Sequence, residues 1–215
     1  MMLPLNLQQQ SNMNKRKANL KILVVSLGGQ YNHLISRVLS ELNVENQIIP
    51  LPISLNQIIE LGIDGLVFGG GPQKVYEEFK KGAFNSLSEV IMEVEVPCLC
   101  ICAAHQLLAL IYNGEVGPAE YPEFGPIEVE VIDEDEILKG LKPSFIAWSS
   151  HNDEVKKLPK QFKLLAKSKK CLIQAIKHES KPVFGVQFHP EVYHTTNGKK
   201  IFENFINIVK EARNE

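Results

Sequence analysis

The stretch 97–112 constrains the fold of this chain more than any other part of the sequence. An apolar run of strand length ends at Cys102, and a helix-like run extends from His105 to Tyr112. The small side chains of Ala103 and Ala104 let the backbone turn sharply between the two runs. Such a turn raises the side chain at its apex above the carboxyl edge of a parallel sheet. The pattern predicts Cys102 as a nucleophile, and the positive end of the following helix favours its thiolate.

A cysteine nucleophile needs a base, and the stretch 186–192 offers one. His189 and Glu191 flank Pro190 directly after an apolar run. Proline favours an extended conformation in the residue before it, and an extended chain places His189 and Glu191 on the same side. We therefore predict His189 as the base and Glu191 as the carboxylate that orients it. The alternative is a buried histidine with a purely structural role.

Short apolar runs alternate with helix-like segments through the first half of the chain, and shorter strand-like runs follow from residue 127. Continuous apolar strands separated by helices indicate a parallel sheet covered on both faces. We predict an α/β three-layer sandwich with a mostly parallel central sheet, in a single domain over residues 20–212. Residues 1–19 are polar and rich in Gln and Asn, so we expect a disordered tail there.

The hydrophobic pattern also predicts the individual elements. The expected strands are 20–27, 48–51, 65–68, 97–102, 127–132, 145–148, 163–166, 172–176 and 183–188. The expected helices are 31–42, 53–61, a segment of undefined limits up to residue 94, 105–112 and 198–212. The glycine-rich loop 69–72 follows the third strand. Because parallel strands end at one edge of a sheet, this loop is expected beside Cys102.

Composition and charge disfavour several classes of function. With a formal net charge of −2, the chain lacks the basic excess of a nucleic-acid-binding domain. No apolar run approaches the roughly 20 residues of a membrane-spanning helix. The first apolar run contains Lys21 and lacks a small-residue cleavage site, which disfavours a signal peptide. Three of the four cysteines crowd one strand, a poor disulfide framework that favours a reducing, cytoplasmic location.

The crowded cysteines, together with His105, raise the question of a metal site. Alternate side chains on a strand lie about 6.6 Å apart, because each residue rises about 3.3 Å. Thiolates bound to one zinc ion must converge, with metal–sulfur distances of about 2.3 Å. We therefore predict no metal in this chain. Cys98 and Cys100 are expected to be buried apolar side chains.

The motifs around the predicted nucleophile and base resemble those of the class I (triad-type) glutamine amidotransferases. The matching residues are Cys102, Gln106, His189, Pro190 and Glu191. Cys100 and Ala104 stand where that family usually has glycine. The resemblance implies the family's flavodoxin-like fold and hydrolysis of L-glutamine to glutamate and ammonia. It further implies a glutamyl thioester on Cys102, a triad completed by His189 and Glu191, and a substrate contact from Gln106.

The loop 69–72 has two interpretations. Without the resemblance it is a plain strand-to-helix turn, although glycines do allow backbone N–H groups to approach a ligand closely. In the family, the corresponding Ser-Gly-Gly-Pro loop contributes to an oxyanion hole. The resemblance therefore implies that Gly70 or Gly71, together with the amide of Ala103, stabilises the oxyanion. Family position does not choose between the two glycines.

Three further stretches, 28–31, 148–155 and 189–195, resemble more narrowly the glutaminase part of GMP synthetases. In relatives the middle stretch adjoins the glutamine pocket, which implies that His151, Asn152 and Asp153 hold the amino-acid end of the substrate. Without the resemblance, this stretch is a solvated polar turn after Trp148. Because its sequence is polar, we expect it to rearrange at modest cost when a partner docks.

The resemblance also implies a division of labour between two chains. Whole GMP synthetases carry an ATP-pyrophosphatase domain with a Ser-Gly-Gly-x-Asp-Ser loop, which this sequence lacks. It implies no cofactor in this chain, with ATP and Mg on a separate ATP-pyrophosphatase subunit that converts XMP to GMP. Two alternatives stay open. One is a catalytically weak regulatory or binding subunit on the same fold, and the other is a γ-glutamyl hydrolase that uses the same triad.

Overall fold

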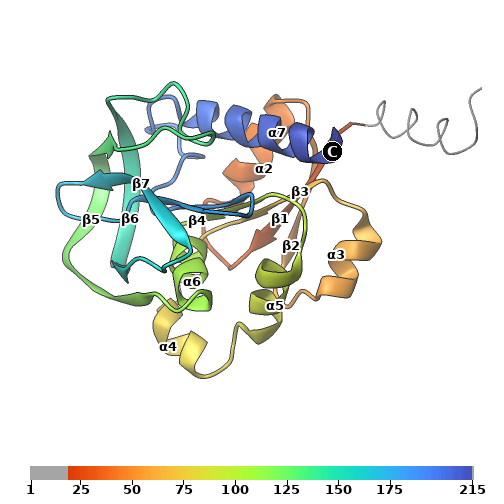
Figure 1. The fold of residues 1–215 in the computed structure, drawn as a ribbon, viewed down its shortest axis with the longest axis horizontal. Helices are drawn as coiled ribbons and strands as arrows, with labels where there is room; N and C mark the ends of the chain where they lie inside the picture. The colour runs from red at the N-terminus through yellow and green to blue at the C-terminus, as the bar shows by residue number, and fades with distance from the viewer. Residues whose placement is uncertain (1–18, 215) are drawn as a thin grey trace, which may run out of the picture.

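A computed structural model describes residues 19–214 of the protein (Figure 1), so the tail expected at residues 1–19 lies almost wholly outside the described residues. The described chain contains nine strands in one sheet. They are β1 (Lys21–Ser26), β2 (Glu45–Pro50), β3 (Gly65–Phe68), β4 (Cys98–Ile101), β5 (Glu115–Val131), β6 (Ser144–Lys157), β7 (Phe162–Ser168), β8 (Ala175–His178) and β9 (Val183–Val186). Their order in the sheet is β2-β1-β3-β4-β9-β8-β7-β5-β6.

The sheet has a parallel half and an antiparallel half. Strands β2, β1, β3, β4 and β9 pair in parallel, whereas β8, β7, β5 and β6 continue the sheet antiparallel from β9. Every residue of β3, β4 and β9 is buried, as expected of parallel strands covered on both faces. The predicted α/β class and its parallel centre are confirmed.

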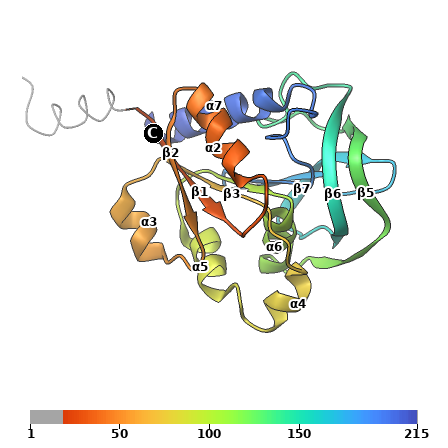
Figure 2. The ribbon, with the colours of Figure 1, turned by 180° about the vertical axis from the view of Figure 1, so that it is seen from behind.

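Helices cover both faces of the parallel half. They are α2 (Asn32–Glu41), α3 (Leu55–Leu61), α4 (Val75–Lys80), α5 (Asn85–Glu93), α6 (Ala103–Ile111) and α7 (Gly198–Asn214). Helices α2 and α7 lie on one face and α3 to α6 on the other (Figures 1 and 2). Neighbouring residues of β1 pack on opposite faces of the sheet. Val24 belongs to the apolar cluster that contains Ile35 of α2 and Phe202 of α7, and Leu23 belongs to the cluster that contains Leu107 of α6. No helix in the described part of the chain is long and apolar enough to cross a membrane.

The largest departure from expectation is the long ribbon of β5 and β6. Strand β5 begins at Glu115 rather than at residue 127, and β6 continues to Lys157, so the stretch 148–155 is strand and not a polar turn. Pro118 and Pro122 resemble turn signals in the sequence. They are tolerated because β5 pairs with β7 only over residues 129–131 and shifts its register to β6 between Pro118 and Glu123.

Candidate active site

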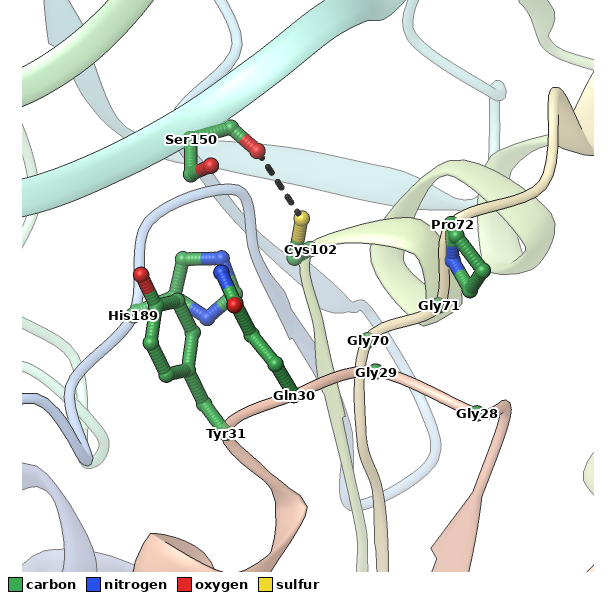
Figure 3. Close-up of a pocket in the computed structure, with 10 residues that line it drawn as sticks. All are labelled: Gly28, Gly29, Gln30, Tyr31, Gly70, Gly71, Pro72, Cys102, Ser150 and His189. Atoms are coloured by element: carbon green, nitrogen blue, oxygen red, sulfur yellow. Dashed lines mark hydrogen bonds between the residues drawn. The ribbon is translucent and has the colours of Figure 1, made fainter.

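Cys102 occupies the sharp turn that the sequence predicts between β4 and α6. Its backbone has φ 56° and ψ −110°. Residues other than glycine rarely adopt this conformation, which costs about 1–3 kcal/mol. Two backbone hydrogen bonds hold it there. The Cys102 N–H donates to the Val186 carbonyl of β9 (2.8 Å), and the Gln106 N–H donates to the Cys102 carbonyl (3.1 Å). The thiol stands at the carboxyl edge of the sheet, 3.9 Å from the Ser150 carbonyl oxygen (Figure 3).

His189 and Glu191 meet directly after β9. The Nδ1 atom of His189 lies 2.7 Å from Oε1 of Glu191, and both residues are buried. The chain forms a turn here, in which the Val192 N–H donates to the His189 carbonyl (3.3 Å). The premise of an extended chain was therefore wrong, and the turn is what brings the carboxylate to the imidazole. With Nδ1 engaged, the Nε2 atom is left for Cys102 and a substrate.

The charge of His189 is set by two opposing effects. Burial disfavours the imidazolium, but the neighbouring Cys102 and Glu191 outweigh it and raise the pKa of His189 well above its ordinary value of 6.5. A protonated His189 can hand a proton to a leaving amine.

Aromatic and hydroxyl groups fix the position of His189. The ring of Tyr31 stands edge-on to the imidazole, with centroids 4.9 Å apart, and the Trp148 indole N–H donates to the Tyr31 hydroxyl (3.3 Å). The Thr195 hydroxyl donates to the His189 carbonyl (2.6 Å), and the His189 N–H donates to the Trp148 carbonyl (2.8 Å). In the sequence, Tyr31 and Trp148 stood out only because they belong to stretches that resemble GMP synthetases. No pattern in the sequence indicated their contact with the histidine.

The loop after β3 is held by the loop after β1. The Gly29 N–H donates to the Gly70 carbonyl (2.9 Å), and the Asn32 amide donates to the Gly29 carbonyl (2.9 Å). A Cβ on Gly29 would lie 2.5 Å from the Gly70 oxygen, so only glycine permits this approach. The C=O and N–H of one trans peptide point in opposite directions. The Gly71 N–H therefore faces away from Gly29.

Two pockets meet at Cys102, and they share Gly71, Pro72 and Ser150. The first, here called the His189 pocket, has a volume of about 300 Å³ and is lined also by Gly28, Gly29, Gln30, Tyr31, Gly70 and His189 (Figure 3). The second, here called the Asp153 pocket, has a volume of about 340 Å³ and is lined also by Gln73, Lys74, Ala103, Gln106, Phe124, His151, Asn152 and Asp153.

The Asp153 pocket brings together the four residues expected to bind substrate. The side-chain amide of Gln106 is buried and donates to the Asp153 carbonyl (2.7 Å). The imidazole of His151 is also buried and turns toward Glu123. Burial raises the pKa of Asp153, while the nearby Lys74 opposes that rise. Lys74 lies before α4, in the segment whose limits the sequence left undefined, and no motif indicated it.

A buried polar cluster lies behind this pocket, centred on Glu123 of β5. One oxygen of Glu123 accepts from the Ser168 hydroxyl (2.6 Å), and the other accepts from the Gln174 amide (2.7 Å) and lies 3.1 Å from Nε2 of His151. Burial works against the carboxylate, but these hydrogen bonds lower the pKa of Glu123 below its ordinary value. The cluster ties β5 and β6 to the end of β7 and to the segment after it. No sequence pattern indicated it, because its members are distant in the chain.

Potential metal ligands do come together in this cluster. Among the described residues, one group of three, Glu123, His151 and Cys171, has ligand atoms within 4.8 Å of one another. Both oxygens of Glu123 are already hydrogen-bonded, and burial raises the pKa of the Cys171 thiol, so it stays protonated. These donors suit a hydrogen-bonded network. Cys98 and Cys100 are buried in the apolar core, as predicted.

Comparison with known proteins agrees with this geometry. The family model described as Glutamine amidotransferase class-I matches residues 23–209. A glutamine-hydrolyzing GMP synthase subunit of Methanothermobacter thermautotrophicus is 44% identical over 189 residues, which cover 88% of this chain and 98% of that protein. The protein of the same name from Pyrococcus furiosus is 46% identical over 190 residues, which cover 88% of this chain and 99% of the relative.

Solved structures give the same result. A crystal structure described as that of a GMP synthase subunit from Thermoplasma acidophilum superposes with a TM-score of 0.86 at 40% identity, covering 92% of this chain and 97% of that one. A glutamine amidotransferase from Thermotoga maritima shares the fold, with a TM-score of 0.69 at 23% identity over 90% of this chain and 84% of its own. On the sequence match and on the fold, the chain belongs to the class-I glutamine amidotransferase family.

Proposed function

We propose that this chain is the glutamine-hydrolysing subunit of a two-subunit GMP synthetase. The observation that carries the proposal is Cys102, strained at a strand-to-helix turn, in a pocket with His189, whose imidazole is hydrogen-bonded to Glu191. Relatives that match almost over their full length and are named as glutamine-hydrolyzing GMP synthase subunits support the choice of synthetase. The ammonia passes to a separate ATP-pyrophosphatase subunit, which converts XMP to GMP with ATP and Mg. This chain holds no cofactor and works in the cytoplasm, where its four free cysteines stay reduced.

Glutamine binds with its amino-acid end in the Asp153 pocket. Lys74 and Asp153 supply the positive and negative charges that match the carboxylate and ammonium groups of an amino acid. Gln106, His151 and Asn152 complete the wall, with Gln106 held by its bond to the Asp153 carbonyl. The side-chain amide of the substrate then reaches Cys102, which lines the same pocket.

Acylation uses the thiolate and the charged imidazole together. Sγ of Cys102 bonds to the amide carbon, and the amide oxygen becomes an oxyanion held by the N–H groups of Gly71 and Ala103. We choose Gly71 over Gly70 because the bond from Gly29 turns the Gly71 N–H away from that loop. His189 gives its proton to the nitrogen, the C–N bond breaks and ammonia leaves. Glu191 stabilises the imidazolium before this transfer.

Deacylation reverses the roles. The now neutral His189 takes a proton from water, and the water oxygen bonds to the thioester carbon. The C–S bond breaks, glutamate is released, and the thiolate and imidazolium are restored. The protein therefore completes the cycle with its own residues and one water molecule.

We expect the partner subunit to control the rate of glutamine hydrolysis, because a glutaminase that acts alone wastes glutamine. We expect the isolated chain to hydrolyse glutamine slowly. A synthetase subunit loaded with ATP, Mg and XMP should raise the rate at least about tenfold, which requires only about 1.4 kcal/mol of barrier lowering. Strand pairing and the buried His151 make a local rearrangement of residues 148–155 costly, so the cheap movement expected from the sequence is disfavoured.

The test is glutamate release by the chain alone and with the loaded partner. A rate that is already full in isolation contradicts partner control and leaves the chemistry standing. No glutamate under either condition overturns the proposed function. Hydrolysis of a γ-glutamyl peptide by the chain alone, faster than hydrolysis of glutamine, favours the hydrolase alternative.

A further inference from the structure

We propose that Gln187 is a further residue of the reaction, and that its side-chain amide donates a hydrogen bond to the sulfur of Cys102. This role rests on the proposed glutaminase function and adds a residue to its machinery. Gln187 follows β9 directly and stands two positions before His189. It is wholly buried and is not among the described residues that line the two pockets at Cys102. It therefore reaches the sulfur from the protein interior and not from the space that glutamine occupies.

The backbone places the amide of Gln187 beside the sulfur. The Cys102 N–H donates to the carbonyl of Val186, the residue before Gln187 (2.8 Å). The Gln187 N–H in turn donates to the Gln174 carbonyl (2.8 Å). Nε2 of Gln187 then lies 3.9 Å from Sγ of Cys102, a distance at which an amide can donate to the large sulfur atom.

A relay of two amides decides which end of Gln187 faces the sulfur. The carbonyl of Asp153 can only accept, so the Gln106 side chain must present its NH₂ group to that carbonyl (2.7 Å). The second hydrogen of the same group is shared with Oε1 of Gln187 (3.1 Å). Because its oxygen is engaged there, Gln187 turns its own NH₂ group toward Cys102. The relay therefore ends in a hydrogen-bond donor at the sulfur.

A donor at this place matters because the charge of the sulfur changes during the reaction. The thiol of Cys102 can donate to the Ser150 carbonyl (3.9 Å), but a carbonyl offers no hydrogen to a thiolate (Figure 3). The amide of Gln187 donates more strongly to a thiolate than to a thiol, since hydrogen bonds to charged groups are shorter and stronger. It therefore favours the thiolate that attacks in acylation and the thiolate that departs in deacylation.

The imidazole of His189 cannot play this part throughout the cycle. Its proton goes to the leaving nitrogen in acylation, so the thioester stands beside a neutral ring. A side-chain amide carries its hydrogens at every step. The N–H of Gln187 also restrains the sulfur from turning about the Cα–Cβ bond of Cys102, which keeps it aimed at the substrate.

Gln187→Met tests the donor. Methionine is similar in length and adapts to irregular spaces, so the packing is largely kept, but it has no hydrogen to donate. In the presence of the loaded partner, kcat for glutamate release should fall at least about tenfold, equivalent to about 1.4 kcal/mol of barrier. The KM for glutamine should change less than about twofold, because Gln106 keeps its bond to the Asp153 carbonyl.

Alkylation of Cys102 by iodoacetamide gives a measurement that does not involve glutamine. The full chain is treated at pH 7, and mass spectrometry follows the peptide that carries Cys102. Gln187→Met should slow the alkylation at least about fivefold, because the thiolate is the reactive form and loses its donor. Unfolding alone would expose the thiol and would not slow its reaction.

Asn204→Leu is the matched control for the loss of a buried amide. Asn204 lies on α7 and donates to the carbonyls of Ile137 and Lys139 (3.0 Å each). Its replacement should lower the melting temperature, as the loss of buried hydrogen bonds does, and leave both kcat and the alkylation rate unchanged. A fall in kcat that is as large in Asn204→Leu as in Gln187→Met would show that the loss follows stability.

Gln187→Glu separates donation from shape. Its carboxylate keeps an oxygen for Gln106 but repels a thiolate, whereas the protonated acid can donate its O–H to the sulfur. Burial raises the pKa of a carboxyl group, so the donating form gains as the pH falls. The rate of Gln187→Glu relative to the original protein should therefore rise at least about threefold from pH 8 to pH 6.

The outcomes separate this role from the proposed function. An unchanged kcat or an unchanged alkylation rate in folded Gln187→Met overturns the role of Gln187 and spares the proposed function. Failure of the original protein to release glutamate with its loaded partner overturns the proposed function, and the alkylation rates then decide the contact by themselves. If Gln187→Met does not fold, Gln187→Glu decides, and a relative rate that does not vary with pH counts against the role.

Discussion

At the scale of single residues, the site depends on positions where one atom more or one charge fewer changes the chemistry. Cys102 is held at φ 56° by hydrogen bonds from two elements, which is why its sulfur points out of the sheet edge. His189 owes its charge to the neighbours Cys102 and Glu191, against the effect of burial. Gly70 lies against both residues, since a Cβ there would be 3.5 Å from Cε1 of His189 and 3.5 Å from Cβ of Cys102. Each of these features can be tested by one substitution.

Glu191→Gln should lower kcat far more than it changes the KM for glutamine. The amide preserves the shape of the side chain but no longer stabilises the imidazolium that donates the proton to the leaving group. Steady-state glutamate release measures both constants. Glu203→Gln, at a half-exposed position on α7, is the matched control and should change neither constant. An unaltered kcat for Glu191→Gln removes the carboxylate from the mechanism.

Gly70→Ala should lower glutamate release on the order of a hundredfold and leave the melting temperature nearly unchanged. The added methyl group meets its neighbours at ordinary contact distances, so folding tolerates it, but it takes up space beside Cys102 and His189 in the pocket that the reacting atoms use. Gly117→Ala is the control, because a Cβ at Gly117 has nothing within 4 Å. Undiminished turnover in folded Gly70→Ala would show that the reacting atoms pass elsewhere.

At the scale of elements, the sequence revealed the turn around Cys102 but not the ribbon of β5 and β6. The turn could be predicted because strand, apex and helix are contiguous in the sequence, and the His189 motif is equally local. The ribbon could not be predicted, because prolines such as Pro118 and Pro122 usually indicate turns. They are tolerated in β5 only where this strand lacks a second partner strand. The pairing of Glu123 with His151 depends on a shifted register that no local pattern reports.

The buried cluster at Glu123 should make the stability of the ribbon depend on pH. The pKa of Glu123 is lower in the folded protein than its ordinary value of 4.5. Its stabilising effect is therefore present above about pH 4.5 and is lost as the pH falls through the folded-state pKa. At pH 7, Glu123→Gln should lower the free energy of unfolding by about 1.5–3 kcal/mol, because it weakens hydrogen bonds to a charged group.

Urea unfolding at pH 7 and again near pH 3 measures this effect. The difference between the original protein and Glu123→Gln should shrink at the lower pH. Glu128→Gln, at an exposed position on the same strand, is the control for a change of charge on β5. A difference of the same size at both pH values would show that the cluster is held by packing and not by the carboxylate charge.

At the scale of the whole molecule, the sheet gathers the site from distant segments. The loops after β1, β3, β4 and β9 meet at the carboxyl edge of the parallel half, and β6 closes that edge from the antiparallel half. The alternation of strands and helices was enough to predict the parallel half and the loops that meet there. The division into two pockets was not predictable, because it depends on how the ribbon lies over Cys102.

The measurement that tests the central claim most directly is the search for the thioester itself. The protein is mixed with glutamine and its loaded partner, quenched in acid within the first turnovers, and examined by mass spectrometry of the intact chain and of its peptides. The account predicts a mass gain of one glutamyl group on the peptide that carries Cys102, retained in Cys98→Ala and absent in Cys102→Ala. Cys98 is wholly buried, which raises its pKa to about 12 and keeps its thiol protonated. A glutamyl group that persists in Cys102→Ala, or glutamate released by that variant at the original rate, would contradict the account.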